Sequence, residues 1–174
     1  MRAPISNAGL QLMALVIFLV LLAVSADAQQ KAVSKAGLSK ANVLAVLASI
    51  DTAIANGDPA GVVAHCTTNA AITVTATIAL HGDKYQTATA YTKDDLRDWL
   101  RIGFLAYSPA PLHRRITSIK IADDGKTARC DSSVVELCSL LGETLTVTSQ
   151  ESLSLALVRG KVMVTRDHEV ATVQ

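Results

Sequence analysis

HRRITSIKIADDGKTARCDSSVVELCSLLGETLTVTSQESLSLALVRGKVMVTRDHEVAT, residues 113–172, is the stretch that decides the fold. Its alternating residue pattern is interrupted at Asp124-Gly125, Leu141-Gly142 and Arg159-Gly160. Asp-Gly between two alternating runs is among the strongest short signals for a β-hairpin, and the other two breaks carry glycine in second place. The stretch therefore predicts four long antiparallel strands joined by hairpins.

Tight two-residue turns at these breaks would set the register of the four strands. Residues opposite each other share a sheet face, and that face recurs at every second residue. The resulting rungs on one face are Ile121–Ala128–Leu155–Val164, Ile119–Cys130–Leu153–Arg166, Thr117–Ser132–Glu151–His168, Arg115–Val134–Ser149–Val170 and His113–Glu136–Val147–Thr172. This face runs from apolar to ionisable, as expected for a pocket with an apolar floor and a wetter opening. A bulge in any strand would turn part of the pattern to the other face.

Residues 1–28 are typical of a signal peptide. Arg2 supplies a positive charge, and residues 10–24 form an apolar run of about fifteen residues, which is short for a membrane span. Ala26-Asp27-Ala28 fits the small-x-small cleavage rule. We expect cleavage after Ala28, a periplasmic or secreted location and no membrane association afterwards. An uncleaved signal anchor is the alternative.

The rest of the chain has the length of one domain. We expect residues 29–40 to be a flexible leader and residues 41–174 to form a single α+β domain. The formal net charge is +1 and aromatic residues make up 3%, whereas a nucleic-acid-binding protein needs a basic footprint and usually stacking aromatics. The four histidines lack ligand spacing and CxxC is missing, so we expect no nucleic acid partner, no metal and no other cofactor.

Capping residues and apolar spacing predict three helices before the hairpins. Ser39 opens the first helix, and Asp58-Pro59 opens a short second helix that ends near residues 67–69. Residues 72–80 alternate as a strand, and a capping box at residues 92–95 opens the third helix. Helices gathered early and strands late favour an α+β fold, with the helices packed on one face of an antiparallel sheet.

Several short segments carry a family resemblance, at residues 54–58, 69–72, 81–82, 124–128 and 158–162. Their order and spacing resemble the nuclear transport factor 2-like superfamily, which includes SnoaL-like and ketosteroid-isomerase-like proteins. The resemblance implies a cone-shaped, cystatin-like curved antiparallel sheet wrapped around N-terminal helices, with an internal pocket. It often implies a homodimer. Thr75 stands where ketosteroid-isomerase-like enzymes place a general-base Asp, so that mechanism is not expected.

Glu151 and His168 face each other in this register and are the candidate catalytic residues. A carboxylate beside an imidazole fixes its tautomer and suits proton transfer or ligand anchoring, although a structural ion pair is the alternative. Arg166 could pair with Glu151 or meet an acidic ligand. The predicted pocket lining is His113, Thr117, Ser132, Glu136, Glu151, Leu153, Arg166 and His168.

The sequence thus predicts an exported domain that binds a small hydrophobic or amphipathic molecule in a partly apolar pocket. An isomerase, cyclase or dehydratase using the Glu151–His168 pair is one alternative, and a protein-interaction module is another. The outer sheet face is expected to form a homodimer through Val135, Leu137, Ala156 and Val158. Cys66, Cys130 and Cys138 are interpreted as small core residues, with a disulfide from Cys66 to one of the others as the alternative.

Overall fold

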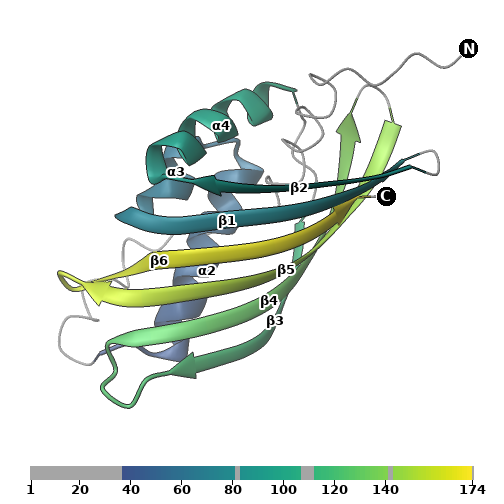
Figure 1. Cartoon of the computed structure of the whole chain (residues 1–174). Coiled ribbons are helices and arrows are strands. Elements are labelled where there is room, and N and C mark those ends of the chain that lie inside the picture. Colours follow the sequence, from purple (N-terminus) through teal and green to yellow (C-terminus); the bar gives the residue numbers. More distant parts are fainter. Residues whose placement is uncertain (1–36, 81–82, 107–111, 141–142, 174) are drawn as a thin grey trace, which may run out of the picture.

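A computed structural model describes residues 37–80, 83–106, 112–140 and 143–173. Its elements are α2 (Lys40–Ala55), α3 (Pro59–Ala64), β1 (Cys66–Leu80), β2 (Asp83–Tyr91), α4 (Lys93–Ala106), β3 (Leu112–Ile121), β4 (Thr127–Leu140), β5 (Glu143–Val158) and β6 (Lys161–Val173). The strands form a curved, unclosed sheet in the order β2-β1-β6-β5-β4-β3, with the helices gathered on one side (Figure 1). The α+β prediction is confirmed.

The helices begin where capping chemistry predicts. Ser39 and Asn42 form the capping box of α2, and the Asp58 side chain accepts the Gly61 N–H at the start of α3. Thr92 and Asp95 exchange the two capping hydrogen bonds that open α4. Each bond satisfies a backbone N–H that the first helical turn cannot pair internally.

The core lies between α2 and the concave face of the sheet. The predicted apolar stripe of α2 is buried and consists of Val43, Val46, Leu47, Ile50 and Ile54. Leu38 is also buried, and its N–H donates to the Gly125 carbonyl at 2.7 Å. Packed structure therefore begins inside the stretch expected to be a flexible leader. Residues 1–36, including the expected signal peptide, lie outside the described residues.

Two elements differ from the sequence prediction. The short helix α3 ends at Ala64 and β1 begins at Cys66, so residues 67–69 belong to a strand and not to the helix end. Strand β2 was not predicted, and it pairs antiparallel with β1 from Leu80–Asp83 to Ile72–Tyr91. Most of its side chains are exposed, which leaves little apolar alternation for a sequence to show.

The register between β4 and β5 is the predicted one, with Cys130 opposite Leu153 and Ser132 opposite Glu151. Strands β3 and β6 depart from it, because the β3–β4 pairing skips Thr117 and the β5–β6 pairing skips Thr165. The Thr117 hydroxyl donates to the Asp131 carbonyl at 2.9 Å, and the Thr165 hydroxyl donates to the Ser154 carbonyl at 3.2 Å. Each extra residue forms a β-bulge, and its own hydroxyl hydrogen-bonds to the neighbouring strand.

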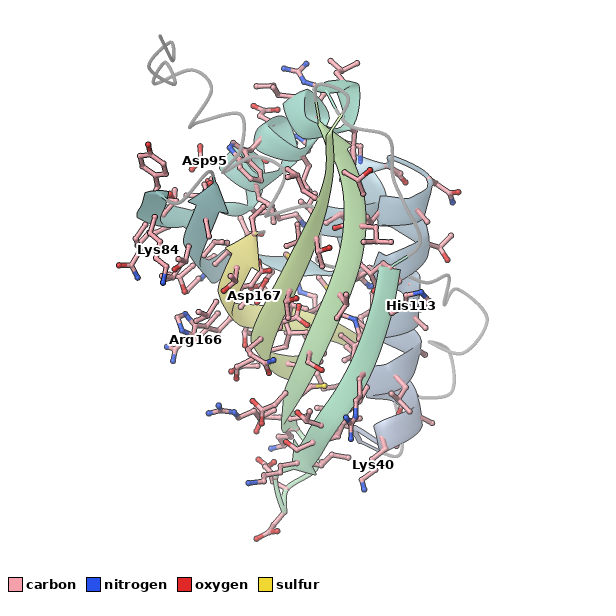
Figure 2. The ribbon with its side chains drawn as sticks, turned by 90° about the vertical axis from the view of Figure 1, so that its right-hand side faces the viewer. Lys40, Lys84, Asp95, His113, Arg166 and Asp167 are labelled. Atoms are coloured by element: carbon pink, nitrogen blue, oxygen red, sulfur yellow. The ribbon has the colours of Figure 1, made fainter. Side chains whose placement is uncertain are left out.

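These bulges reverse which side chains face the core beyond them. Arg114 in β3 is turned inward, and Asp167 and Glu169 in β6 are buried. The predicted facing of Glu151 and His168 is therefore wrong, because Glu151 lies opposite Glu169. Four predicted pocket residues are exposed instead, namely His113, Thr117, Arg166 and His168. Figure 2 shows Arg166 projecting away from the helices.

No helix within the described ranges is long and apolar enough to cross a membrane.

Candidate functional site

Polar side chains gather in the middle of the concave sheet face. Ser132 from β4, Ser149 and Glu151 from β5, and Asp167 and Glu169 from β6 are all buried. Arg114 reaches them from β3 with its side chain only 5% exposed. We call Arg114, Ser132, Ser149, Glu151, Asp167 and Glu169 the interior polar cluster. Buried ionisable groups are rare unless they are paired or used, so this cluster is the candidate functional site.

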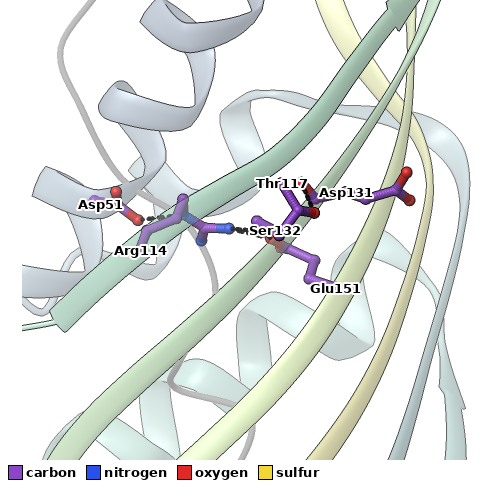
Figure 3. Close-up of polar contacts among 6 residues, drawn as sticks. All are labelled: Asp51, Arg114, Thr117, Asp131, Ser132 and Glu151. Carbon is purple, nitrogen blue, oxygen red and sulfur yellow. Dashed lines mark hydrogen bonds and ion pairs between the residues drawn. The ribbon is translucent and has the colours of Figure 1, made fainter.

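Arg114 is the centre of the hydrogen bonding in the cluster (Figure 3). Its Nε donates to Asp51 of α2 at 3.1 Å, and its Nη1 donates to Ser132 at 2.9 Å and also to Glu151. The Ser132 hydroxyl in turn donates to the same Glu151 oxygen at 2.6 Å. Arg114 thereby ties β3, β4, β5 and α2 together across the core.

Electrostatics keep Arg114 charged. Burial by itself lowers the pKa of Arg114, but the attraction of Glu151 and Asp51 outweighs it and raises that pKa above its ordinary value. Removing one partner of such a buried pair leaves an uncompensated charge in the core, which typically costs about 3–5 kcal/mol. The Arg114–Glu151 pair is therefore a structural requirement of the cluster.

Burial favours the neutral form of the other buried carboxyls. Burial, reinforced by the charge of Glu151, raises the pKa of Asp167 well above its ordinary value. Burial, together with Asp167 and Glu151, does the same for the pKa of Glu169. Burial also raises the pKa of Glu136, further along β4, to about 8. A carboxyl that keeps its proton at neutral pH can donate a hydrogen bond as well as accept one.

Several buried polar atoms of the cluster have no hydrogen-bond partner among the described residues. They are Arg114 Nη2, Ser149 Oγ, Glu151 Oε1, Asp167 Oδ1 and both carboxyl oxygens of Glu169. Ser149 lies near enough to lower the pKa of Glu169, but the two side chains fall short of hydrogen-bond geometry. A buried unsatisfied polar group costs about 1–3 kcal/mol, so a group of them calls for an explanation.

The structure brings together only part of the predicted pocket. Ser132, Glu136, Glu151 and Leu153 are buried on the concave side. His168 lies on the outer face, where its Nδ1 is 3.0 Å from the Thr73 hydroxyl, so it cannot act with Glu151. Sequence reasoning missed four contributors, namely Arg114, Ser149, Asp167 and Glu169. Ser149 lay on a predicted inward rung, but the other three would have required knowledge of the bulges.

The cysteines that the structure describes are core residues. Cys66 and Cys130 are buried and not disulfide-bonded, as the favoured interpretation predicted, while the Cys138 side chain lies outside the described residues. Burial raises the pKa of Cys130 to about 11 and that of Cys66 to about 12. Neither thiol therefore supplies a thiolate nucleophile at neutral pH.

Within the part of the chain that the structure describes, no three His, Cys, Asp or Glu side chains are arranged to hold a metal ion. The carboxyl, hydroxyl and guanidinium groups of the cluster are suited to hydrogen bonding, charge pairing and proton transfer.

Solved structures of other proteins share this architecture. A ketosteroid isomerase-like protein from Erwinia carotovora atroseptica aligns over 82% of this chain and 96% of its own, with 18% identity and a TM-score of 0.54. A putative scytalone dehydratase from Novosphingobium aromaticivorans aligns over 68% and 73%, with 13% identity and a TM-score of 0.53. A nuclear transport factor 2-like protein from Shewanella oneidensis aligns over 69% and 88%, with 15% identity and a TM-score of 0.50.

The chain has a nuclear transport factor 2-like fold. At identities this low, the structural similarity establishes the fold alone, and the activity has to be argued from the site. No protein-family model and no curated protein matches the chain. Within the nuclear transport factor 2-like fold, the interior polar cluster occupies the concave side of the sheet, facing α2 through the Arg114–Asp51 contact.

Proposed function

We propose that this protein binds a small amphipathic molecule at the interior polar cluster, between the concave sheet face and α2. The observation that carries the proposal is a set of buried polar atoms that lie on neighbouring strands and have no hydrogen-bond partner among the described residues. Ser149, Glu151 and Leu153 alternate along β5, opposite Ala171, Glu169 and Asp167 of β6. A ligand with one or two polar groups would satisfy several of these atoms at once.

The cluster offers both kinds of hydrogen-bonding group. Arg114 Nη2 and the protonated carboxyls of Asp167 and Glu169 can donate to a carbonyl or hydroxyl oxygen of the ligand. Glu151 Oε1 can accept from a ligand hydroxyl or amine. Apolar neighbours on the same face, Val134, Val147 and Leu153, are fully buried and suit the apolar part of such a ligand.

A proton-transfer enzyme of the isomerase or dehydratase kind is a second candidate. Burial raises the pKa of Glu136 to about 8, which is close to the working pH, where a general acid or base is most effective. A ketosteroid isomerase-like protein and a putative scytalone dehydratase share the fold. Here a buried carboxyl replaces the Glu–His pair that the sequence suggested.

Location and assembly complete the proposal. The signal-like residues 1–28 support a periplasmic or secreted protein, and exposed apolar residues on the outer sheet face support a homodimer.

Ser149→Ala tests the binding site. The Ser149 hydroxyl has no hydrogen-bond partner among the described residues, so its loss should leave the melting temperature unchanged or slightly higher. Wild type and variant would be extracted and analysed by mass spectrometry, and then screened by thermal shift against steroid ketones, phenols and fatty acids. We expect a compound that stabilises the wild type and binds Ser149→Ala more weakly.

Ser133→Ala is the matched control, because Ser133 lies on the same sheet but on the alternate face of β4. It should bind like the wild type. The proposal would be overturned if no compound co-purifies or stabilises the protein, or if Ser149→Ala retains every ligand at full affinity.

A further inference from the structure

A second concavity lies where β1 and β6 separate. It encloses about 570 Å³, within the range of small-molecule sites, and its lining includes Thr67, Thr68, Asn69, Lys93, Arg159 and Thr165. It shares none of its lining with the interior polar cluster. Its shape follows from an irregularity of the sheet, and its chemistry follows from the side chains gathered around it.

The concavity exists because the β1–β6 ladder is interrupted. The pairing passes from Cys66–Val164 directly to Ala71–Arg166. Residues 67–70 of β1 therefore lie opposite a single residue of β6, Thr165. The pairing of β1 with β2 begins only at Ile72. Residues 67–69 therefore belong to neither ladder, and all three line the pocket.

Two cations border the pocket. Lys93, the first residue of α4, donates from Nζ to the Cys66 carbonyl at 2.9 Å, which holds its ammonium group at the pocket wall. Arg159 approaches from the β5–β6 turn. Thr67, Thr68, Thr165 and Asn69 supply hydroxyl and amide groups, and Cys66, Val158 and Met163 supply an apolar part. The lining includes no carboxylate from the described residues. This composition favours an anionic group over a cation or a purely apolar ligand.

The backbone conformation of Arg159 also indicates a functional position. Its φ of 50° makes it the one non-glycine residue with positive φ in the described part of the chain. Gly160 follows with a φ of 79°, so both turn residues are left-handed, as in a type I′ hairpin turn. Asn, Asp or Gly normally fills the first of these positions, because an ordinary side chain is strained there. Strained residues cluster at ligand-binding sites.

We propose that this pocket binds a small molecule through an anionic group, a phosphate or a carboxylate. Lys93 and Arg159 flank the anion, and Thr67, Thr68 and Asn69 donate hydrogen bonds to its oxygens. The site is separate from the proposed interior ligand site, and its test does not depend on that ligand.

The test is titration of the purified full chain with inorganic phosphate and, separately, with succinate, at constant ionic strength set with chloride. Amide chemical shifts from nuclear magnetic resonance would report binding. We expect saturable shifts centred on residues 67–69 and Thr165. Tighter binding of phosphate assigns the phosphate class, and tighter binding of succinate assigns the carboxylate class. Shifts that do not saturate, or that spread evenly over the lysines and arginines, would overturn the proposal.

Arg159→Asn separates binding from folding. Asparagine accepts the left-handed conformation, so the variant should melt at the wild-type temperature or above it, while its affinity falls about tenfold through loss of a charge-assisted hydrogen bond. Lys161→Gln removes the same charge from an exposed residue of the same hairpin outside the pocket lining, and it should bind like the wild type. Equal losses in both variants, or full affinity in Arg159→Asn, would refute the site.

Discussion

Glu151 and Glu169 lie directly opposite each other on β5 and β6, and both side chains are buried. Only Glu151 is engaged by Arg114. Burial and the two neighbouring acids, Asp167 and Glu151, raise the pKa of Glu169 well above its ordinary value. The rung is therefore asymmetric, with one carboxyl group paired to a cation and the other in surroundings that favour its neutral form.

Glu169→Gln should flatten the pH dependence of stability. The unfolded chain releases the Glu169 proton near the ordinary value of 4.5, whereas the folded protein releases it only at a higher pH, so the wild type loses stability as the pH rises above 4.5. Glutamine imitates the protonated form and removes this loss. Urea unfolding at pH 5 and pH 8 should show the variant gaining on the wild type at the higher pH. A parallel decline of both proteins would contradict the assignment.

Glu136→Gln should act in the same direction within a defined window. The pKa rises from 4.5 to about 8 on folding, so the wild type loses stability between these values and little above them. The difference at pH 8 is at most roughly 4 kcal/mol, from 1.36 kcal/mol per pKa unit. Urea unfolding across this range measures it. Asp123→Asn, which removes a carboxyl group at an exposed turn residue, is the matched control.

Arg114→Met should destabilise the protein strongly. It leaves Glu151 without its cation in the core, a change that typically costs about 3–5 kcal/mol. Adding Glu151→Gln should recover much of that loss, because the orphaned charge is gone. Chemical denaturation of the two single variants and the double variant gives the coupling between the residues.

Two exposed positions serve as controls for this cycle. Arg115→Met, the next residue on β3, and His168→Ala on the outer face should each change stability by less than about 0.5 kcal/mol. If Arg114→Met were as stable as the wild type, or if His168→Ala lost much stability, the inward and outward faces would have been assigned the wrong way round.

The outer sheet face is expected to form a homodimer. Val135 and Leu137 on β4 and Val170 on β6 are 41%, 53% and 45% exposed. The two β4 residues lie opposite Thr148 and Thr146 of β5, and Val170 lies opposite Gln150. Val158 is also exposed but lies toward the other end of β5, and Ala156 is half-buried. Light scattering should give twice the chain mass for the wild type and a monomer for Leu137→Lys. A wild-type monomer throughout the micromolar range would argue against this interface.

Export should remove residues 1–28. Intact-mass measurement of the protein recovered from the exported fraction should match a chain that begins at Gln29. Ala28→Asp should block cleavage, because the position before the cut requires a small residue. Recovery of a wild-type chain that still carries Met1 would favour the signal-anchor alternative.

Local signals in the sequence were sufficient for the helix starts and for the hairpins that join β3 to β6. Ser39, Asp58 and Thr92 cap helices because their side chains accept the first backbone N–H groups, which depends only on nearby residues. The β4–β5 register followed from its turn for the same reason. Strand β2 was not predicted, because its side chains are mostly polar and exposed and show little apolar alternation. It forms a strand through its pairing with β1.

The sequence by itself determined that side chains in β3 and β6 alternate between two faces, but tertiary structure alone decided which face was inside. An alternating strand carries the same pattern in either orientation, and one extra residue exchanges the faces. Thr117 and Thr165 supply that residue, each held by a hydrogen bond to a carbonyl of the neighbouring strand. Such a bond forms only when the strands are already paired, so nothing local marks either threonine as a bulge. That is why Asp167 and Glu169 line the core, and Arg166 and His168 do not.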